Sequence, residues 1–318
     1  MFENRLTRIL GTEYPIILGP MRRITLGEMA AVVSNCGAFG QIATGLLPPE
    51  KLSQEIELAQ SLTTRPFGIN VPLIRKQAME YLEIAIEKGV RVITASAGKP
   101  DAIIERAQKA GVKVLHKVSS VSQGLRAQDA GADAVIAMGY EASGHVGREK
   151  TTTFCLVPQL ADALQIPVVA AGGVGDHRGL LAALALGAEG VEIGTRFLAT
   201  EQCPVPQFYK QSILEAADDG TLLLGKKAMP VRVLRNEISC QIQNPDQRQE
   251  DEGVRAQNDT LDYIDPRSDS QRALMMSGQI AGLVREVVGA EKVIEDMMAR
   301  AADLSARLGK YFIPARNG

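Results

Sequence analysis

The stretch EASGHVGRE at residues 141–149 combines a carboxylate, several small residues and one of the three histidines of the chain. Small residues allow the backbone to approach a ligand closely, and a histidine beside a ligand can transfer protons near neutral pH. Ser143, Gly144 and His145 are therefore candidate site residues. His145 is either a proton-transfer group or a structural histidine, and these residues alone leave both interpretations open.

Two glycine-rich stretches, AAGGVGD at 170–176 and IGTRF at 193–197, follow short apolar runs. Glycine N–H groups and helix N-termini bind phosphate, typically in the loops after the last two strands of a barrel. The spacing is not GxGxxG, so we expect no dinucleotide-binding domain. The predicted phosphate-binding residues are Gly172, Gly173, Gly194 and Thr195.

Other candidates stand at the ends of further apolar runs. Gly19 and Met21 belong to a Gly-Pro-Met turn, for which a purely structural turn is the alternative, and the amide of Asn70 can both donate and accept. Neighbours on a strand face opposite ways, so only one of His116 and Lys117 points inward. We predict Lys117, which would need an anion there; a lysine that extends to the rim is the alternative.

Eight short runs rich in β-branched and aliphatic residues recur along the first 200 residues. Helical patterns, many of them closed by glycine, lie between them. This alternation predicts a (β/α)8 TIM barrel with strands buried on both faces; a doubly wound open sheet is the rival. The runs are 14–19, 38–43, 66–71, 90–96, 113–118, 134–139, 167–173 and 190–195.

We predict two parts of the chain: a barrel over 1–200, and an insertion with C-terminal helices over 201–318 that packs on the barrel mouth. The polar segment 244–260 is predicted to be a solvated loop or mobile segment. The last 45 residues or so carry an amphipathic pattern typical of two or more helices.

The formal net charge of −2 and the absence of a basic block argue against nucleic acid or an anionic membrane as a partner. Residues 1–10 contain no apolar signal core, and no apolar run approaches membrane-spanning length. The four cysteines are scattered, without CxxC or metal-ligand spacing. These features predict a reduced cytoplasmic protein with no metal site.

A series of motifs resembles the nitronate monooxygenase (formerly 2-nitropropane dioxygenase) family, which includes the FMN-dependent enoyl-acyl-carrier-protein (ACP) reductase II. The resemblance covers nearly the whole chain, and its order is more specific than any single motif. The motifs are GPM…MAAVVSNCGAFG, RPFGINV, HK, EASGHVG, IPVVAAGGVGD, ALGAEGVEIGTRFLAT and MSGQIAGLV.

The resemblance implies an FMN-dependent barrel in which Gly19 and Met21 lie against the flavin ring. Asn70 and Lys117 would contact its polar edge, where Lys117 would stabilise the negative charge of reduced flavin. His145 would act as a general base or as a hydrogen-bond donor to the substrate. The remaining cofactor-binding residues implied are Ser143, Gly144, Gly172, Gly173, Gly194, Thr195 and Gln279.

The leading functional hypothesis is oxidation of alkyl nitronates with O₂, and the second is an NAD(P)H-dependent enoyl-ACP reductase. A quinone reductase and a barrel that binds a phosphorylated ligand without redox chemistry are further alternatives. Arg22, Arg23, Arg148 and Lys150 could form a basic patch for an acyl carrier protein, or simply a solvated rim. Pro20 departs from the family pattern. The substrate, the choice of NADH or NADPH and a homodimeric state stay open.

Overall fold

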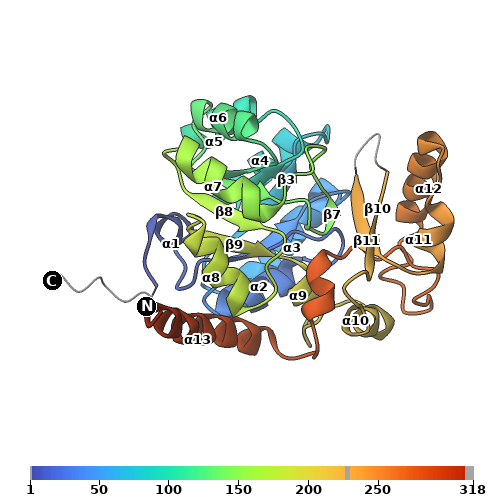
Figure 1. Cartoon of the computed structure of the whole chain (residues 1–318). Helices are drawn as coiled ribbons and strands as arrows, with labels where there is room; N and C mark the ends of the chain where they lie inside the picture. Colours follow the sequence, from blue (N-terminus) through green and yellow to red (C-terminus); the bar gives the residue numbers. More distant parts are fainter. Residues whose placement is uncertain (1, 226–229, 312–318) are drawn as a thin grey trace.

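The computed structural model describes residues 2–225 and 230–311, and its centre is a ring of eight parallel strands (Figure 1). The strands follow one another around the ring in the order β1-β9-β8-β6-β5-β4-β3-β2. A bridge between Ile17 and Phe39 joins β1 to β2 and closes the ring. The strands are β1 (Ile16–Leu18), β2 (Gly40–Ala43), β3 (Phe67–Pro72), β4 (Val92–Ser96), β5 (Lys113–Val118), β6 (Ala134–Met138), β8 (Val168–Ala171) and β9 (Gly190–Ile193). The predicted TIM barrel and its eight strands are confirmed.

The lower half of the barrel interior, toward the amino ends of the strands, is apolar. Inward-facing residues such as Ile17, Phe39 and Leu115 are fully buried there and form one cluster. Helix α1 (Arg5–Leu10) closes this end of the barrel, because its Leu6 and Leu10 belong to the same cluster. The side chains of this cluster are all apolar and closely packed. This half of the barrel interior therefore serves packing rather than ligand binding.

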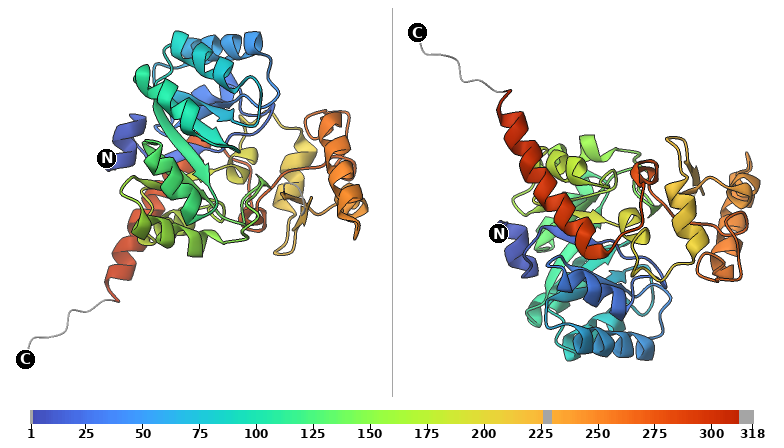
Figure 2. Two further views of the ribbon diagram at one scale, coloured as in Figure 1. Left: turned by 90° about the horizontal axis from the view of Figure 1, so that it is seen from above. Right: turned by 90° about the horizontal axis from the view of Figure 1, so that it is seen from below.

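Helices surround the ring in the usual alternation of a barrel, with one departure at the end. The strand β9 is followed by the four-residue helix α9 (Thr195–Leu198), and the long helix α13 (Ala290–Gly309) packs against α8 and α2 in the outer layer (Figures 1 and 2). The other outer helices are α2 (Gly27–Asn35), α3 (Pro49–Leu62), α4 (Ala78–Glu87), α5 (Asp101–Lys109), α6 (Val121–Asp129), α7 (Thr153–Ala163) and α8 (His177–Ala185).

Between α9 and α13 the chain builds a second, smaller body. Its antiparallel strands β10 (Thr221–Leu224) and β11 (Val231–Leu234) pair with each other, and β11 also pairs with β7 (Gly144–His145). We call the described part of residues 221–276 the cap; Figures 1 and 2 show its helices on the far side of the small sheet from the barrel. The remaining elements are α10 (Gln207–Leu214), α11 (Glu237–Ile242), α12 (Gln247–Thr260) and the 3₁₀ helix η1 (Gln279–Leu283).

The prediction of a solvated loop or mobile segment over 244–260 was wrong, because most of this segment is helix α12. Asp246 caps the helix by accepting from the backbone N–H groups of Arg248 and Gln249. Val254 is buried in the core of the cap, and the buried Glu250 accepts from the N–H of Gly225 at 2.9 Å. Its few inward-facing contacts therefore stabilise a helix whose average composition is strongly polar.

The C-terminal segment contributes η1 and then α13, which lies in the outer helical layer. The predicted division of the chain at residue 200 stays a prediction. Within the described ranges no helix is both long and apolar enough to cross a bilayer.

We expect Leu6→Ala to lower the free energy of unfolding by about 2–5 kcal/mol, because it leaves a cavity in the closed end of the barrel. Urea denaturation followed by circular dichroism measures this. Leu62→Ala is the matched control, since Leu62 ends α3 with 47% of its surface exposed. Equal midpoints for the two variants would contradict the role of α1 as a plug.

Candidate active site

A cavity of about 1030 Å³ lies at the carboxyl ends of the strands, between the barrel and the cap. A small pocket of about 90 Å³ lies beside it, and residues including Met21, Lys117 and Ser143 line both. Barrel enzymes carry their chemistry at this end of the strands. The two spaces therefore form one continuous candidate site.

The structure brings most of the predicted site residues to these two spaces. Asn70, Gly144 and His145 line the large cavity. Gln279 lines neither space, but its neighbours Gly278 and Ile280 line the small pocket. The predicted residues around the small pocket are Gly19, Met21, Lys117, Ser143, Gly172, Gly173, Gly194 and Thr195.

The glycines of the small pocket are required by its geometry. Gly172 and Gly173 have φ angles of 94° and 75°, in the left-handed region that side chains disfavour. A Cβ atom on Gly172 would lie 2.8 Å from the backbone nitrogen of Ala142, and one on Gly19 would lie 3.1 Å from the backbone of Gly194. At these glycines the wall of the small pocket is therefore closely packed backbone, and we call this part of the wall the cradle.

The carboxylate of Glu141 binds the backbone at the start of helix α7. Both of its oxygens accept from the backbone N–H of Thr153, at 3.0 and 2.9 Å. Thr153 is the first residue of α7, whose N-cap residue Thr152 makes no side-chain cap bond. Glu141 thus satisfies the N-terminus of α7 and holds the loop after β6 against it.

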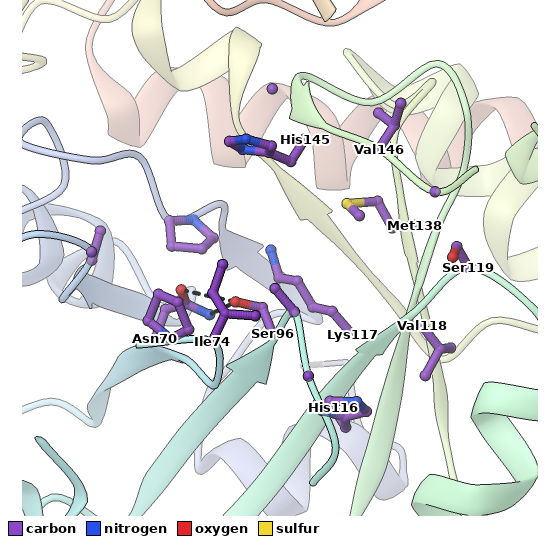
Figure 3. Close-up of a pocket in the computed structure, with 18 of the residues that line it drawn as sticks. Asn70, Ile74, Ser96, His116, Lys117, Val118, Ser119, Met138, His145 and Val146 are labelled. Atoms are coloured by element: carbon purple, nitrogen blue, oxygen red, sulfur yellow. Dashed lines mark hydrogen bonds between the residues drawn. The ribbon is translucent and has the colours of Figure 1, made fainter. Parts of the chain in front are cut away.

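His145 lies on a strand rather than in a free loop. It pairs with Val231 across β7 and β11, and the N–H of Val146 donates to the carbonyl of Pro230 at 2.9 Å. The buried Arg232 supports this pairing, because its guanidinium donates to the carbonyl of Tyr140 at 3.0 Å. The cap therefore fixes the position of the imidazole, which projects into the cavity (Figure 3).

The surroundings of His145 favour its neutral form. His145 is exposed toward the open cavity, and partial desolvation by the cavity walls lowers its pKa below the usual 6.5. The positive charges of Arg22 and Arg75 lower it further. A neutral imidazole can accept a proton or donate a hydrogen bond at pH 7. The site thus contains a group suited to proton transfer.

Lys117 and His116 face opposite sides of β5. Lys117 forms an ion pair with Glu192 on β9 and lines both spaces. His116 is 4% exposed, lies apart from the Lys117 side chain and lines only the large cavity (Figure 3). Burial lowers the pKa of His116 to about 4. The inward direction predicted for Lys117 agrees with this geometry, and the anion that it meets within the chain is a carboxylate.

Sequence reasoning missed three buried polar residues at the top of the barrel interior. Gln41, Thr94 and Glu192 are at most 7% exposed, and they link Lys117 to Asn70 by hydrogen bonds. Each interrupts an apolar run at an inward position. A polar residue inside such a run is the signal that could have found them.

The large cavity continues away from the small pocket, past the loop 96–101 to Arg126 on α6. Arg75 and Lys99 also line it, and the acidic residues near these cations are Asp101 and Asp129. This outer arm is open to solvent and carries charges of both signs.

Arg22 lies in the wall of the large cavity and connects the barrel to the cap. Its Nε donates to the hydroxyl of Tyr263 at 3.1 Å, and its guanidinium lies 5.7 Å from the centre of the Tyr263 ring. A second bond goes to the carbonyl of Asn258. Arg22 therefore helps to hold the cap over the mouth and is not a free surface cation.

A barrel with a glycine cradle, an inward lysine and a neutral histidine at the carboxyl ends of its strands has the arrangement of a barrel enzyme. A model of the family described as nitronate monooxygenase matches residues 3–300. The probable nitronate monooxygenase of Staphylococcus saprophyticus is 31% identical, over 96% of this chain and 99% of the relative. The chain therefore belongs to the nitronate monooxygenase family and is an oxidoreductase of a flavoprotein family.

Two further relatives show the range of the similarity. An octahydro-indene-carboxyl-CoA dehydrogenase of Mycobacterium tuberculosis is 35% identical over 73% of this chain and 66% of the relative. The structure of FabK from Thermotoga maritima superposes with a TM-score of 0.94 at 36% identity, over 98% of this chain and 100% of FabK. The chain is thus similar to proteins with differently named activities.

We expect Gly173→Asp to weaken flavin binding by tenfold or more, that is by about 1.4 kcal/mol. The new carboxylate would strain a left-handed position and stand beside Glu141, in a cradle suited to an anion. The measurement is flavin content after purification and titration of the flavin-free protein. Gly89→Asp is the control, because Gly89 has a φ of 74° with nothing within 4 Å of its Cβ position. Normal flavin content in Gly173→Asp would refute the prediction that Gly173 binds the phosphate of the flavin.

Proposed function

We propose that the chain is an FMN-dependent reductase that uses NAD(P)H to reduce the double bond of an extended enoyl thioester. The observation that carries this proposal is the outer arm of the cavity, which continues from Lys117 and His145 to Arg126. A volume of about 1030 Å³ is at the upper end of the roughly 300–1,000 Å³ typical of ligand sites. The similarity to a carboxyl-CoA dehydrogenase supports a thioester substrate.

The site has features that fit FMN. At Gly172 and Gly173 the wall of the small pocket is backbone without a side chain, and backbone groups of this kind bind phosphate. The small pocket meets the large cavity at Met21 and Lys117. These residues would hold the phosphate in the cradle and the ring near Met21, Lys117 and Asn70. Bound FMN supplies hydride transfer.

The residues around the substrate have separable roles. His145 would donate a hydrogen bond to the thioester carbonyl, which gains negative charge during reduction. Lys99 and Arg126 would attract the anionic tail of the substrate or of the nicotinamide. In the overall reaction the enoyl thioester gains one hydride and one proton, while NAD(P)H becomes NAD(P)⁺. Docking of an acyl carrier protein belongs to the same proposal.

A second candidate function is nitronate oxidation with O₂, the leading hypothesis from the sequence. The neutral His145 favours it, because an unprotonated imidazole can act as a base toward a nitroalkane. Arg22 and Arg75 could attract the anionic nitronate. The similarity to a probable nitronate monooxygenase over almost the full length supports it as well.

Anaerobic reduction of the flavin separates the two functions. We expect rapid bleaching of the flavin absorbance by NADH or NADPH, followed by reoxidation with an enoyl thioester. Propionate 3-nitronate and a quinone are tested in parallel runs. Bleaching by the nitronate alone would overturn the reductase proposal in favour of nitronate oxidation, and a purified protein without flavin absorbance would overturn both.

We expect His145→Ala to retain FMN and to lose most of its turnover, roughly 10²-fold or more for a lost proton-transfer or oxyanion group. Stopped-flow and steady-state rates with equal flavin loading measure this. His177→Ala is the control, because His177 begins α8 and lines neither the large cavity nor the small pocket. Unchanged turnover in His145→Ala would rule out the proposed role.

The pH profile gives an independent test of His145. Because its pKa is lowered, the neutral form prevails above the usual value of 6.5. If the neutral form is required, kcat/KM falls as the pH drops through a pKa below 6.5. The residual rate of His145→Ala should lack this acid limb. An unchanged acid limb in the variant would assign it to another group.

A further inference from the structure

A chain of hydrogen bonds crosses the upper barrel interior from Asn70 to Glu192. Asn70 Nδ2 donates to Thr94 Oγ1 at 2.9 Å, and Thr94 Oγ1 donates to Gln41 Oε1 at 2.6 Å. Gln41 Nε2 donates to Glu192 Oε2 at 3.2 Å, and the other carboxylate oxygen accepts from Lys117 Nζ. Four strands thus contribute to one network, in addition to the strand that carries Lys117.

Every donor in this network points toward Glu192. An ionised carboxylate has no hydrogen to donate, so it accepts from both Gln41 and Lys117. The amide nitrogen of Gln41 also donates to the carbonyl of Leu18 at 2.6 Å, which fixes the orientation of this amide. Its oxygen then accepts from Thr94, whose own oxygen accepts from Asn70. The negative charge of Glu192 therefore sets the donor and the acceptor of each hydrogen bond in the network.

The burial of the network makes this direction hard to reverse. Gln41 and Thr94 are fully buried, and Asn70 and Glu192 are 5% and 7% exposed. Water cannot readily replace a partner at such positions, and an unpaired group there is costly. The consequence at the cavity is that the amide oxygen of Asn70 is left as an acceptor, and within the described chain it accepts from Ser96 Oγ over 3.5 Å.

We infer that Glu192 is a positioning residue that sets the charge and the hydrogen-bonding pattern presented to the flavin ring. It holds Lys117 and compensates its positive charge, and it orients Asn70 so that the amide oxygen faces the ligand as an acceptor. This inference rests on the proposed binding of FMN beside Lys117. Glu192 thereby limits the stabilisation that Lys117 gives to the anionic reduced flavin, and so it lowers the reduction potential of the bound cofactor.

The test is the midpoint potential of the FMN-loaded Glu192→Gln protein, measured by anaerobic titration against a reference dye. Glutamine has nearly the same size and no charge, so the positive charge of Lys117 is no longer compensated. We expect the reduction equilibrium to shift at least tenfold toward reduced flavin, a rise of about 30 mV or more for a two-electron couple. Sulfite, which forms an anionic flavin adduct, should bind at least tenfold more tightly.

Glu189→Gln is the matched control. Glu189 precedes β9 at the opposite end of the barrel, where it pairs with Arg5. The same change of charge there should leave the potential and sulfite binding unaltered. Lys117→Gln should shift both quantities in the opposite direction from Glu192→Gln, and it tests the inference separately should Glu192→Gln fail to fold or to retain FMN.

An unchanged or lowered potential in Glu192→Gln, with normal flavin content and an unchanged urea midpoint, would show that Glu192 serves only packing and would overturn the inference. If Lys117→Gln also leaves the potential unchanged, the inference fails even without the first variant. These outcomes are independent of the substrate. A wild-type protein that binds no flavin would instead overturn the proposed function.

Discussion

The constraint on which the rest of this structure depends is closure of the eight-stranded ring. Closure directs alternate side chains of every strand into one narrow space, where they must pack or pair with each other. The chain meets this constraint in two layers. The lower layer is apolar and is completed by Leu6 and Leu10 of α1. The upper layer is polar and contains the ion pair of Lys117 with Glu192. The boundary between the layers divides the part that stabilises the barrel from the part that faces the ligand.

The cap has a second structural role besides covering the mouth. Because β7 pairs with β11, the histidine of the site belongs to both the barrel loop and the cap. Arg232 under Tyr140 and Arg22 against Tyr263 join the two bodies on either side of the cavity. Any displacement of the cap would therefore move His145 relative to Lys117, which is fixed to the barrel. Access of the substrate and the geometry of the site are consequently coupled.

The sequence predicted the barrel well because a strand buried on both faces gives a continuous apolar run, and eight such runs have few alternative folds. Prediction from the sequence failed for elements that are stabilised by residues far away along the chain. The strand β7 has only two residues, and its partner Val231 lies far along the chain. The helix α12 was missed because contacts such as that of Val254, rather than its mean polarity, stabilise it. The eighth outer position is filled by α13, about a hundred residues after the strand that it follows in the ring.

Where glycine geometry or strand alternation required a particular residue, as at Gly173 and Lys117, the structure places that residue at the small pocket, and its role stays a prediction. Glu192 was not found: a carboxylate inside an apolar run does indicate an inward polar position, but it does not show that Lys117 is the partner. In the proposed function the cradle and Lys117 hold the flavin. Arg22, Lys99 and Arg126 line the parts of the cavity that only a substrate or a nicotinamide would reach. In the proposed function the choice between a nitronate and a thioester therefore depends on the outer arm, which differs from the small pocket in the charges that line it, rather than on the flavin.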